Sequence, residues 1–202
     1  MAIVAALLVG FLALNGEAGP PRYECAVDPG PPTRVRVWQI AGVRRIATGP
    51  EFVYRHRGRM ASAADIDDDG RLDLLVLVHK STRYDPRPGW RPFVYTLRDD
   101  QWVPKWLGSR VGRPLLEAAL VYTPGGVRLL TIEDFGKGQT GLTLYHWTGF
   151  GFRGEWTGEP MPGLSGLRVM DEDCDGVDEA SLLAAEGRRR YVFRNGGYAP
   201  AR

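Results

Sequence analysis

DIDDDGRLD, Asp65–Asp73, and DEDCDGVDE, Asp171–Glu179, are two acidic stretches of the same design, and they decide which fold this chain is expected to adopt. Each has carboxylates at its first, third, fifth and ninth positions and glycine at its sixth. Alternate residues of a tight loop point inward and glycine permits the sharp turn, so this spacing gathers oxygen atoms around a hard cation. We therefore predict two Ca²⁺ sites.

The predicted ligands are the four carboxylates of each loop and the backbone carbonyl of its seventh residue: Asp65, Asp67, Asp69, Arg71 and Asp73, then Asp171, Asp173, Asp175, Val177 and Glu179. An all-oxygen set favours Ca²⁺ over zinc or copper, and Mg²⁺ prefers a stricter octahedral shell with more waters. An EF-hand needs glutamate at position twelve, where this chain has Val76 and Leu182. The alternative is that both stretches are ordinary acidic turns.

Composition is typical of one globular domain with a substantial core. The chain has 202 residues, of which 44% are hydrophobic and 25% charged, and its formal net charge is only +2. This balance argues against a nucleic acid or an anionic membrane surface as partner.

The N-terminus is typical of an export signal. An apolar run from Ala2 to Leu14 is followed by small and polar residues, which predicts a signal peptide over residues 1–18. No Lys or Arg precedes the run, so retention as an anchor is the alternative, but the run is short for a membrane span. We expect a secreted or periplasmic protein without a membrane span in its mature form, with an N-terminal arm over residues 19–34 and the folded domain over residues 35–202.

The chain has two cysteines, Cys25 and Cys174, and an oxidising compartment would allow them to form a disulfide. Such a bond would connect the N-terminal arm to the second acidic loop. The alternative is a pair of unbonded thiols.

Segments that follow the acidic loops also resemble each other. YTLRDDQWVPKWLG from Tyr95 aligns without gaps with YHWTGFGFRGEWTG from Tyr145, and YVFRNGGYAP from Tyr191 is a third copy, which gives a period of about 50 residues. Within a unit, LLVLV at residues 74–78 is apolar on both faces, as expected of a strand between two layers. A middle unit lacks the acidic loop, because alignment of Gly125 with Gly70 puts Arg128 at the ninth position. Four short antiparallel strands per unit predict an all-β fold of propeller blades.

The pattern D-x-D-x-D-G-x-x-[DE] followed by an apolar strand resembles the FG-GAP and VCBS-type repeats, which form calcium-loop β-propellers like the heads of integrin α-chains. The resemblance extends from about Val35 to the C-terminus and implies a small propeller of about four blades with Ca²⁺ on one face. Paired FG and GAP signatures are missing and the blade count is low, so an open or incomplete ring is an alternative.

Long variable loops are expected at the end of the blades opposite the acidic loops. The segment from His79 to Pro92 carries aromatic and basic residues that suit binding of a protein or glycan, namely Arg83, Tyr84, Arg87 and Trp90. The alternative is a proline-stiffened loop that folds Trp90 onto its own blade.

Recognised catalytic patterns are missing from the sequence, so the expected function is a non-catalytic binding or scaffold module with structural calcium. The rival is a polysaccharide-active enzyme that uses carboxylates outside the metal loops as acid and base, among them Glu133, Asp134 and Glu155.

Overall fold

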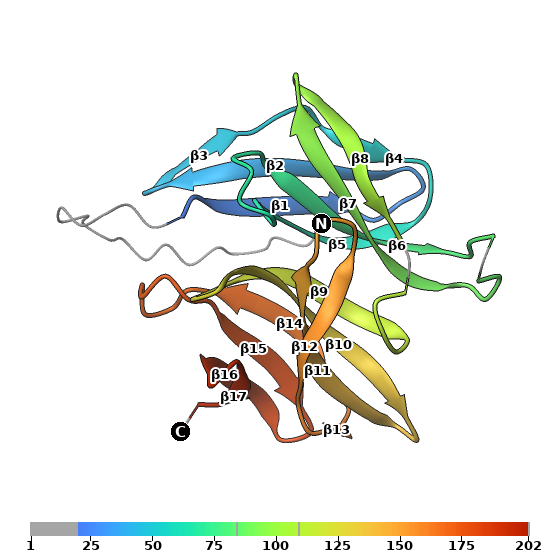
Figure 1. Ribbon diagram of the computed structural model, residues 1–202, viewed down its shortest axis with the longest axis vertical. Helices are drawn as coiled ribbons and strands as arrows, with labels where there is room; N and C mark the ends of the chain where they lie inside the picture. Colours follow the sequence, from blue (N-terminus) through green and yellow to red (C-terminus); the bar gives the residue numbers. More distant parts are fainter. Residues whose placement is uncertain (1–19, 84, 109, 202) are drawn as a thin grey trace, which may run out of the picture.

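The computed structural model describes residues 20–83, 85–108 and 110–201, and every regular element in these ranges is a β-strand. The strands form three antiparallel sheets, of which the N-terminal one lies at the top and the C-terminal one at the bottom of Figure 1. The all-β prediction is thus confirmed. The expected signal peptide lies outside the described residues, and none of the residues described forms a helix long and apolar enough to cross a membrane.

The first sheet is formed by the N-terminal part of the described chain. Its order is β1-β2-β3, with β4 also paired to β2. Its strands are β1 (Arg22–Asp28), β2 (Thr33–Ala41), β3 (Arg44–Ala47) and β4 (Phe52–Tyr54). The expected N-terminal arm therefore contains a strand, because Arg22–Asp28 pairs along its whole length with β2.

The second sheet has nine strands and consists of two meanders. The first meander contains β5 (Gly58–Ala64), β6 (Asp73–Lys80), β7 (Gly89–Arg98) and β8 (Gln101–Leu107). The second contains β9 (Leu115–Thr123), β10 (Gly126–Gly136), β11 (Gln139–Trp147) and β12 (Phe152–Thr157), with β13 (Met161–Pro162) paired to β11. Only the pair Trp90 and Leu115 joins β7 to β9, so the two meanders are nearly separate.

The third sheet is a C-terminal meander of four strands. They are β14 (Ser165–Met170), β15 (Glu179–Ala184), β16 (Gly187–Arg194) and β17 (Gly197–Pro200), paired in chain order. The hairpin turns have the backbone that their sequences predict, since Asp99 and Asp100 between β7 and β8 and Asn195 and Gly196 between β16 and β17 all have positive φ.

Three apolar cores lie between successive meanders. One joins the first sheet to β5–β8, the second joins β5–β8 to β9–β12, and the third joins β9–β12 to the C-terminal sheet. Strand β6 contributes to two of them: Leu74, Val76 and Val78 face the first core, whereas Leu75 and Leu77 face the second. The prediction of a strand apolar on both faces is confirmed.

The first strands of the meanders lie next to one another. Strand β1 packs against β5, β5 against β9, and β9 against β14 (Figure 1). The acidic loops connect β5 to β6 and β14 to β15, so both leave the ends of first strands. The β6–β7 connection leaves the other end of β6.

Candidate metal centres and the basic end

Both acidic loops are built on the same backbone scaffold. In the first, Asp65 accepts hydrogen bonds from the backbone N–H groups of Asp69 and Gly70 at 3.1 and 2.7 Å. In the second, Asp171 accepts them from Asp175 and Gly176, both at 3.1 Å. The fourth and sixth residues of each loop have positive φ, which supplies the sharp turn: Asp68, Gly70, Cys174 and Gly176.

The ninth residue closes each loop from the start of the next strand. Asp73 accepts the Ile66 N–H at 3.2 Å, and Glu179 accepts the Glu172 N–H at 2.8 Å. Asp73 is fully buried and also accepts the hydroxyl of Thr96. Burial raises the pKa of Asp73, although the hydrogen bonds from Thr96 and Lys105 act in the opposite direction.

Carboxylate oxygens converge in each loop. One oxygen from each of three residues lies within 4.8 Å of the others, and the sets are Asp65, Asp67 and Asp73, then Asp171, Asp173 and Glu179. Calcium–oxygen distances of about 2.3–2.6 Å allow two ligands of one ion to be up to about 5 Å apart, so both sets fit a Ca²⁺ ion.

The fifth-position carboxylates do not join these clusters. Asp69 instead accepts the N–H of Arg71 at 2.9 Å, and Asp175 accepts that of Val177 at 2.8 Å. These aspartates stabilise the turn, because each bonds the backbone two residues later. Both aspartates thus support the turn, and they and the carbonyls of Arg71 and Val177 stay predicted ligands.

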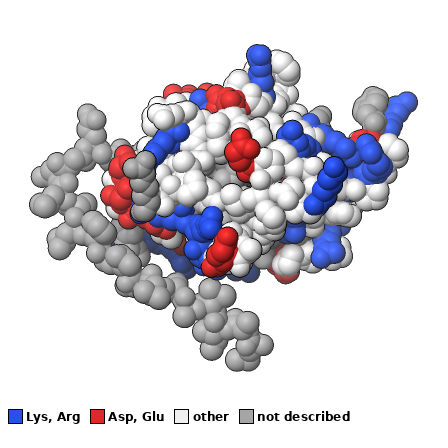
Figure 2. All heavy atoms as spheres, turned by 90° about the horizontal axis from the view of Figure 1, so that it is seen from below, with Lys and Arg blue, Asp and Glu red and all other residues white. Residues whose placement is uncertain are grey.

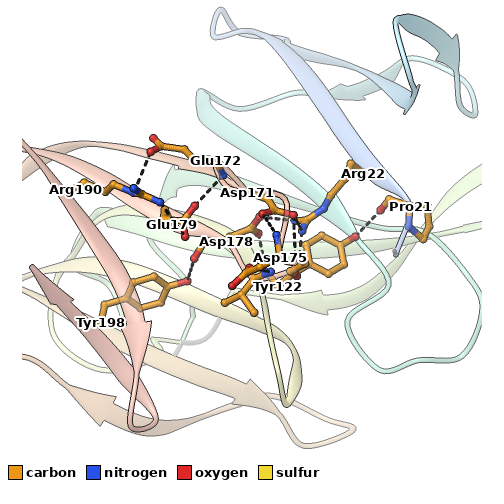
Figure 3. A network of polar contacts seen from close by, with 12 residues as sticks. Pro21, Arg22, Tyr122, Asp171, Glu172, Asp175, Asp178, Glu179, Arg190 and Tyr198 are labelled. Carbon is orange, nitrogen blue, oxygen red and sulfur yellow. Dashed lines mark hydrogen bonds and ion pairs between the residues drawn. The ribbon is translucent and has the colours of Figure 1, made fainter. Parts of the chain in front are cut away.

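The second loop is also held by contacts from residues far away in the sequence, which the loop motif does not predict. Arg22 of β1 donates to Asp171 Oδ2 at 3.0 Å and to the Gly176 carbonyl at 3.1 Å, and it also pairs with Asp178 (Figure 3). Its guanidinium lies 4.2 Å from the centre of the Tyr122 ring. The N-terminal strand is thereby tied to the last acidic loop.

Asp178 is the buried centre of this network. The Tyr122 N–H donates to its carboxylate at 2.7 Å, and the Tyr198 hydroxyl donates to its carbonyl at 2.9 Å (Figure 3). Burial raises its pKa, and the Tyr122 N–H and Arg22 oppose that shift. The residues that sequence reasoning missed are separated from the loop by up to 156 positions, so no local motif marks them.

Cys25 and Cys174 are free thiols in this structure, so the predicted disulfide is not formed here. Both line the same cavity of about 850 Å³ between the first strands of the meanders. Burial, and to a smaller extent Glu24, raises the pKa of Cys25 to about 12, which keeps it as the unreactive thiol at neutral pH. The bond stays a prediction for the oxidised chain.

The predicted binding loop is shorter than expected, because β6 extends to Lys80 and β7 begins at Gly89. Trp90 lies on a strand, where it packs edge-on against His79 with ring centres 5.1 Å apart. Arg59 covers it at 4.1 Å from the ring. Trp90 thus lies on β7 rather than in the loop, and because it also lines the cavity beside Arg87, its part in binding stays a prediction.

The rest of this loop is organised by Asp85. It pairs with Arg91 at 2.9 Å and Arg87 at 3.6 Å, and also with Arg110. The hydrogen bond from Arg91 is the main reason that the pKa of Asp85 falls to about 2. Arg83 also has an interaction partner, and Tyr84 lies outside the described residues.

Basic side chains gather at the end of the molecule where this loop lies. The side chains of Arg87, Arg110 and Arg113 are 79%, 37% and 48% exposed, and all three line a cavity of about 370 Å³. On the face drawn in Figure 2, Lys and Arg predominate toward the right, whereas Asp and Glu gather at the left beside further basic side chains. This face is therefore more basic at the end of the β6–β7 connection than at the end of the acidic loops.

Each of the carboxylates suggested for an enzyme has a partner within the protein. Glu133 is fully buried and accepts hydrogen bonds from Thr143 and Tyr145 at 3.1 and 2.5 Å. Glu155 is paired with Arg128 at 2.8 Å. Asp134 accepts the N–H of Gly136 at 2.7 Å.

Comparison with models of known protein families gives no match, and a search among curated proteins finds no relative. A functional proposal for this chain therefore rests on the geometry of the two acidic loops and of the basic end.

Proposed function

We propose that this protein is an exported, calcium-stabilised β-propeller of four blades that acts as a non-catalytic binding or scaffold module. The observation that carries the proposal is the scaffold shared by the two acidic loops: the same backbone hydrogen bonds, the same positive-φ positions and three convergent carboxylates in each. Ordinary acidic turns do not need this complete agreement.

The arrangement of sheets supports the propeller. The first sheet, the two halves of the nine-stranded sheet and the C-terminal sheet are four antiparallel units in chain order, with their first strands adjacent and a core between each successive pair. Blades of a propeller pack in this way around a central axis. Residues 22–54 are the first blade in this proposal.

Calcium is structural in this account. Three clustered carboxylates repel one another unless a cation neutralises them, and the loops join strands that contribute to the cores. An ion that binds only the folded chain stabilises it by about 2.7 kcal/mol at a concentration one hundred times its dissociation constant.

The binding surface of the module is the basic end. Exposed arginines around the cavity beside Arg87, Arg110 and Arg113 suit a protein or glycan with negatively charged groups, because guanidinium binds carboxylate or sulfate in a bidentate manner. Separation of acidic and basic ends would orient such a partner. Burial of Glu133 and pairing of Glu155 favour binding over catalysis.

We expect chelation of calcium to lower the unfolding temperature of the wild-type chain by about 5–10 °C relative to millimolar Ca²⁺, from the stabilisation above and the usual 2–4 °C per kcal/mol for a chain of this size. Thermal unfolding with Ca²⁺ and with excess chelator measures this difference.

Asp173→Asn removes one ligand charge from the second loop and should abolish the part of the difference that comes from this loop. Asp100→Asn is the matched control, because Asp100 is exposed in a turn with φ of 56°, which asparagine accepts. An unfolding temperature that is the same with calcium and with chelator would contradict the proposal.

A further inference from the structure

The two acidic loops differ in how closely a basic side chain contacts their clustered carboxylates. In the first, Lys105 of β8 places its Nζ 2.7 Å from Asp67 Oδ1 and 2.9 Å from Asp73 Oδ2. These are two of the three carboxylates in the cluster. The Lys105 side chain is 13% exposed, so the ammonium is largely enclosed in the loop. Burial opposes its charge, but the bonds to Asp67 and Asp73 outweigh that effect and raise the pKa of Lys105.

The position of Lys105 is set by a β-bulge. Strand pairing shifts register between Val94 and Tyr95, and Tyr95 pairs with Pro104, which leaves Lys105 unpaired and directed toward the loop. A bulge re-aims a side chain while the strand continues, so this ammonium is held by the sheet rather than by a mobile surface segment.

The middle unit has the same pair of positions with the charges exchanged. The pairing of β11 with β12 shifts register between Leu144 and Tyr145, which makes a second bulge. In this bulge Tyr145 pairs with Gly154, as Tyr95 pairs with Pro104 in the first unit. Glu155 is therefore the bulge residue that corresponds to Lys105. Arg128 corresponds to Asp73, because each residue comes directly before the strand residue that pairs with the bulge tyrosine. These strand residues are Leu129, which pairs with Tyr145, and Leu74, which pairs with Tyr95. Arg128 and Glu155 form an ion pair of 2.8 Å. The bulge residue thus reaches the ninth loop position in both units.

In the last unit the corresponding residue is too short to reach. Ala201 follows Pro200, the partner of Tyr191, and Glu179 occupies the ninth loop position. Among the described residues, Arg190 pairs with Glu179: its Nη2 lies 3.4 Å from Glu179 and 3.5 Å from Asp173. Its side chain is 39% exposed and pairs at shorter distance, 3.0 Å, with Glu172 outside the ligand set. Glu179 is buried, but the 39% exposed guanidinium of Arg190 is screened by solvent more than the 13% exposed ammonium of Lys105.

We propose that Lys105 is a built-in counter-ion of the first acidic loop, so that the second loop is the high-affinity Ca²⁺ site and the first binds Ca²⁺ only when the ammonium is displaced. The inference rests on the proposed calcium function and ranks its two sites. Arg22 also contacts the second cluster, at 3.0 Å from Asp171 Oδ2, but it is shared with Asp178 and the Gly176 carbonyl, whereas the Lys105 ammonium contacts two of the three clustered carboxylates.

Isothermal titration of the full chain with Ca²⁺ tests this ranking. We expect one strong site in the wild type and two in Lys105→Met, with affinity at the first loop raised at least tenfold. Asp67→Asn added to Lys105→Met should remove the new site, which assigns it to the first loop. Lys80→Met is the matched control, because it removes the same charge from a side chain that lies over the Phe93 ring.

The reverse exchange tests the inference without relying on the folding of Lys105→Met. Ala201→Lys should weaken the strong site at least tenfold, because it supplies the missing ammonium. Equal affinity at two sites in the wild type, unchanged in Lys105→Met, would overturn this inference while leaving the proposed calcium function intact. No calcium binding by any of these proteins would instead refute the proposed function itself.

Discussion

Replacement of either Leu74 or Leu75 by alanine is expected to lower the free energy of unfolding by about 2–5 kcal/mol, although the two residues are neighbours on one strand. Leu74 is fully buried in the core between the first sheet and β5–β8, and Leu75 is 1% exposed in the core between β5–β8 and β9–β12. Each substitution leaves a cavity in a different core. Urea denaturation of both variants measures the loss.

Leu107→Ala is the control for this pair, because Leu107 is 51% exposed on β8, and it should change stability by less than about 0.5 kcal/mol. The two core substitutions test the packing of sheets on both faces of β6. A large loss for only one of them would contradict the account, because it would leave one face of β6 without a core.

Glu133→Ala is expected to lower the free energy of unfolding by about 2–4 kcal/mol. Its carboxylate accepts the hydroxyls of Tyr145 at 2.5 Å and Thr143 at 3.1 Å, in a site without exposed surface on Glu133. Burial and the nearby carboxylate raise the pKa of Tyr145, so its phenol remains a donor at neutral pH. Removal of the acceptor leaves buried hydroxyls unpaired, and each such group costs about 1–3 kcal/mol.

Glu133→Gln tests whether Glu133 stabilises the fold as a hydrogen-bond acceptor or through its negative charge. Glutamine keeps the shape and one acceptor oxygen, so we expect a loss below about 1 kcal/mol in the same denaturation experiment. If the glutamine variant lost as much stability as the alanine variant, the hydroxyl network would not explain why Glu133 is buried.

The sequence predicts those features that arise from local chemistry. LLVLV at residues 74–78 becomes β6 with a core on each face, because β-branched and leucine side chains alternate without a polar residue. Asn195 and Gly196 form the expected turn, because both tolerate positive φ. The convergence of the first, third and ninth loop carboxylates is likewise local, since it follows from spacing and a glycine turn.

Features that depend on contacts distant in the chain could not be predicted. Lys105 reaches Asp73 across 32 positions because a bulge redirects it, and Arg22 reaches Asp178 across 156 positions because β1 packs near the last loop. The position of Trp90 on a strand rather than in a loop has a similar cause. Its proline-rich and glycine-rich neighbourhood suggests a loop, but pairing with β6 extends β7 through it.

The most direct test of the central claim is an anomalous difference map from a crystal of this protein grown with millimolar Ca²⁺. The account predicts a peak in the second loop, about 2.3–2.6 Å from oxygen atoms of Asp171, Asp173 and Glu179. A peak in the first loop as well would change only the ranking of the two sites. Absence of a peak from both loops at that concentration would contradict the claim that this is a calcium-stabilised protein.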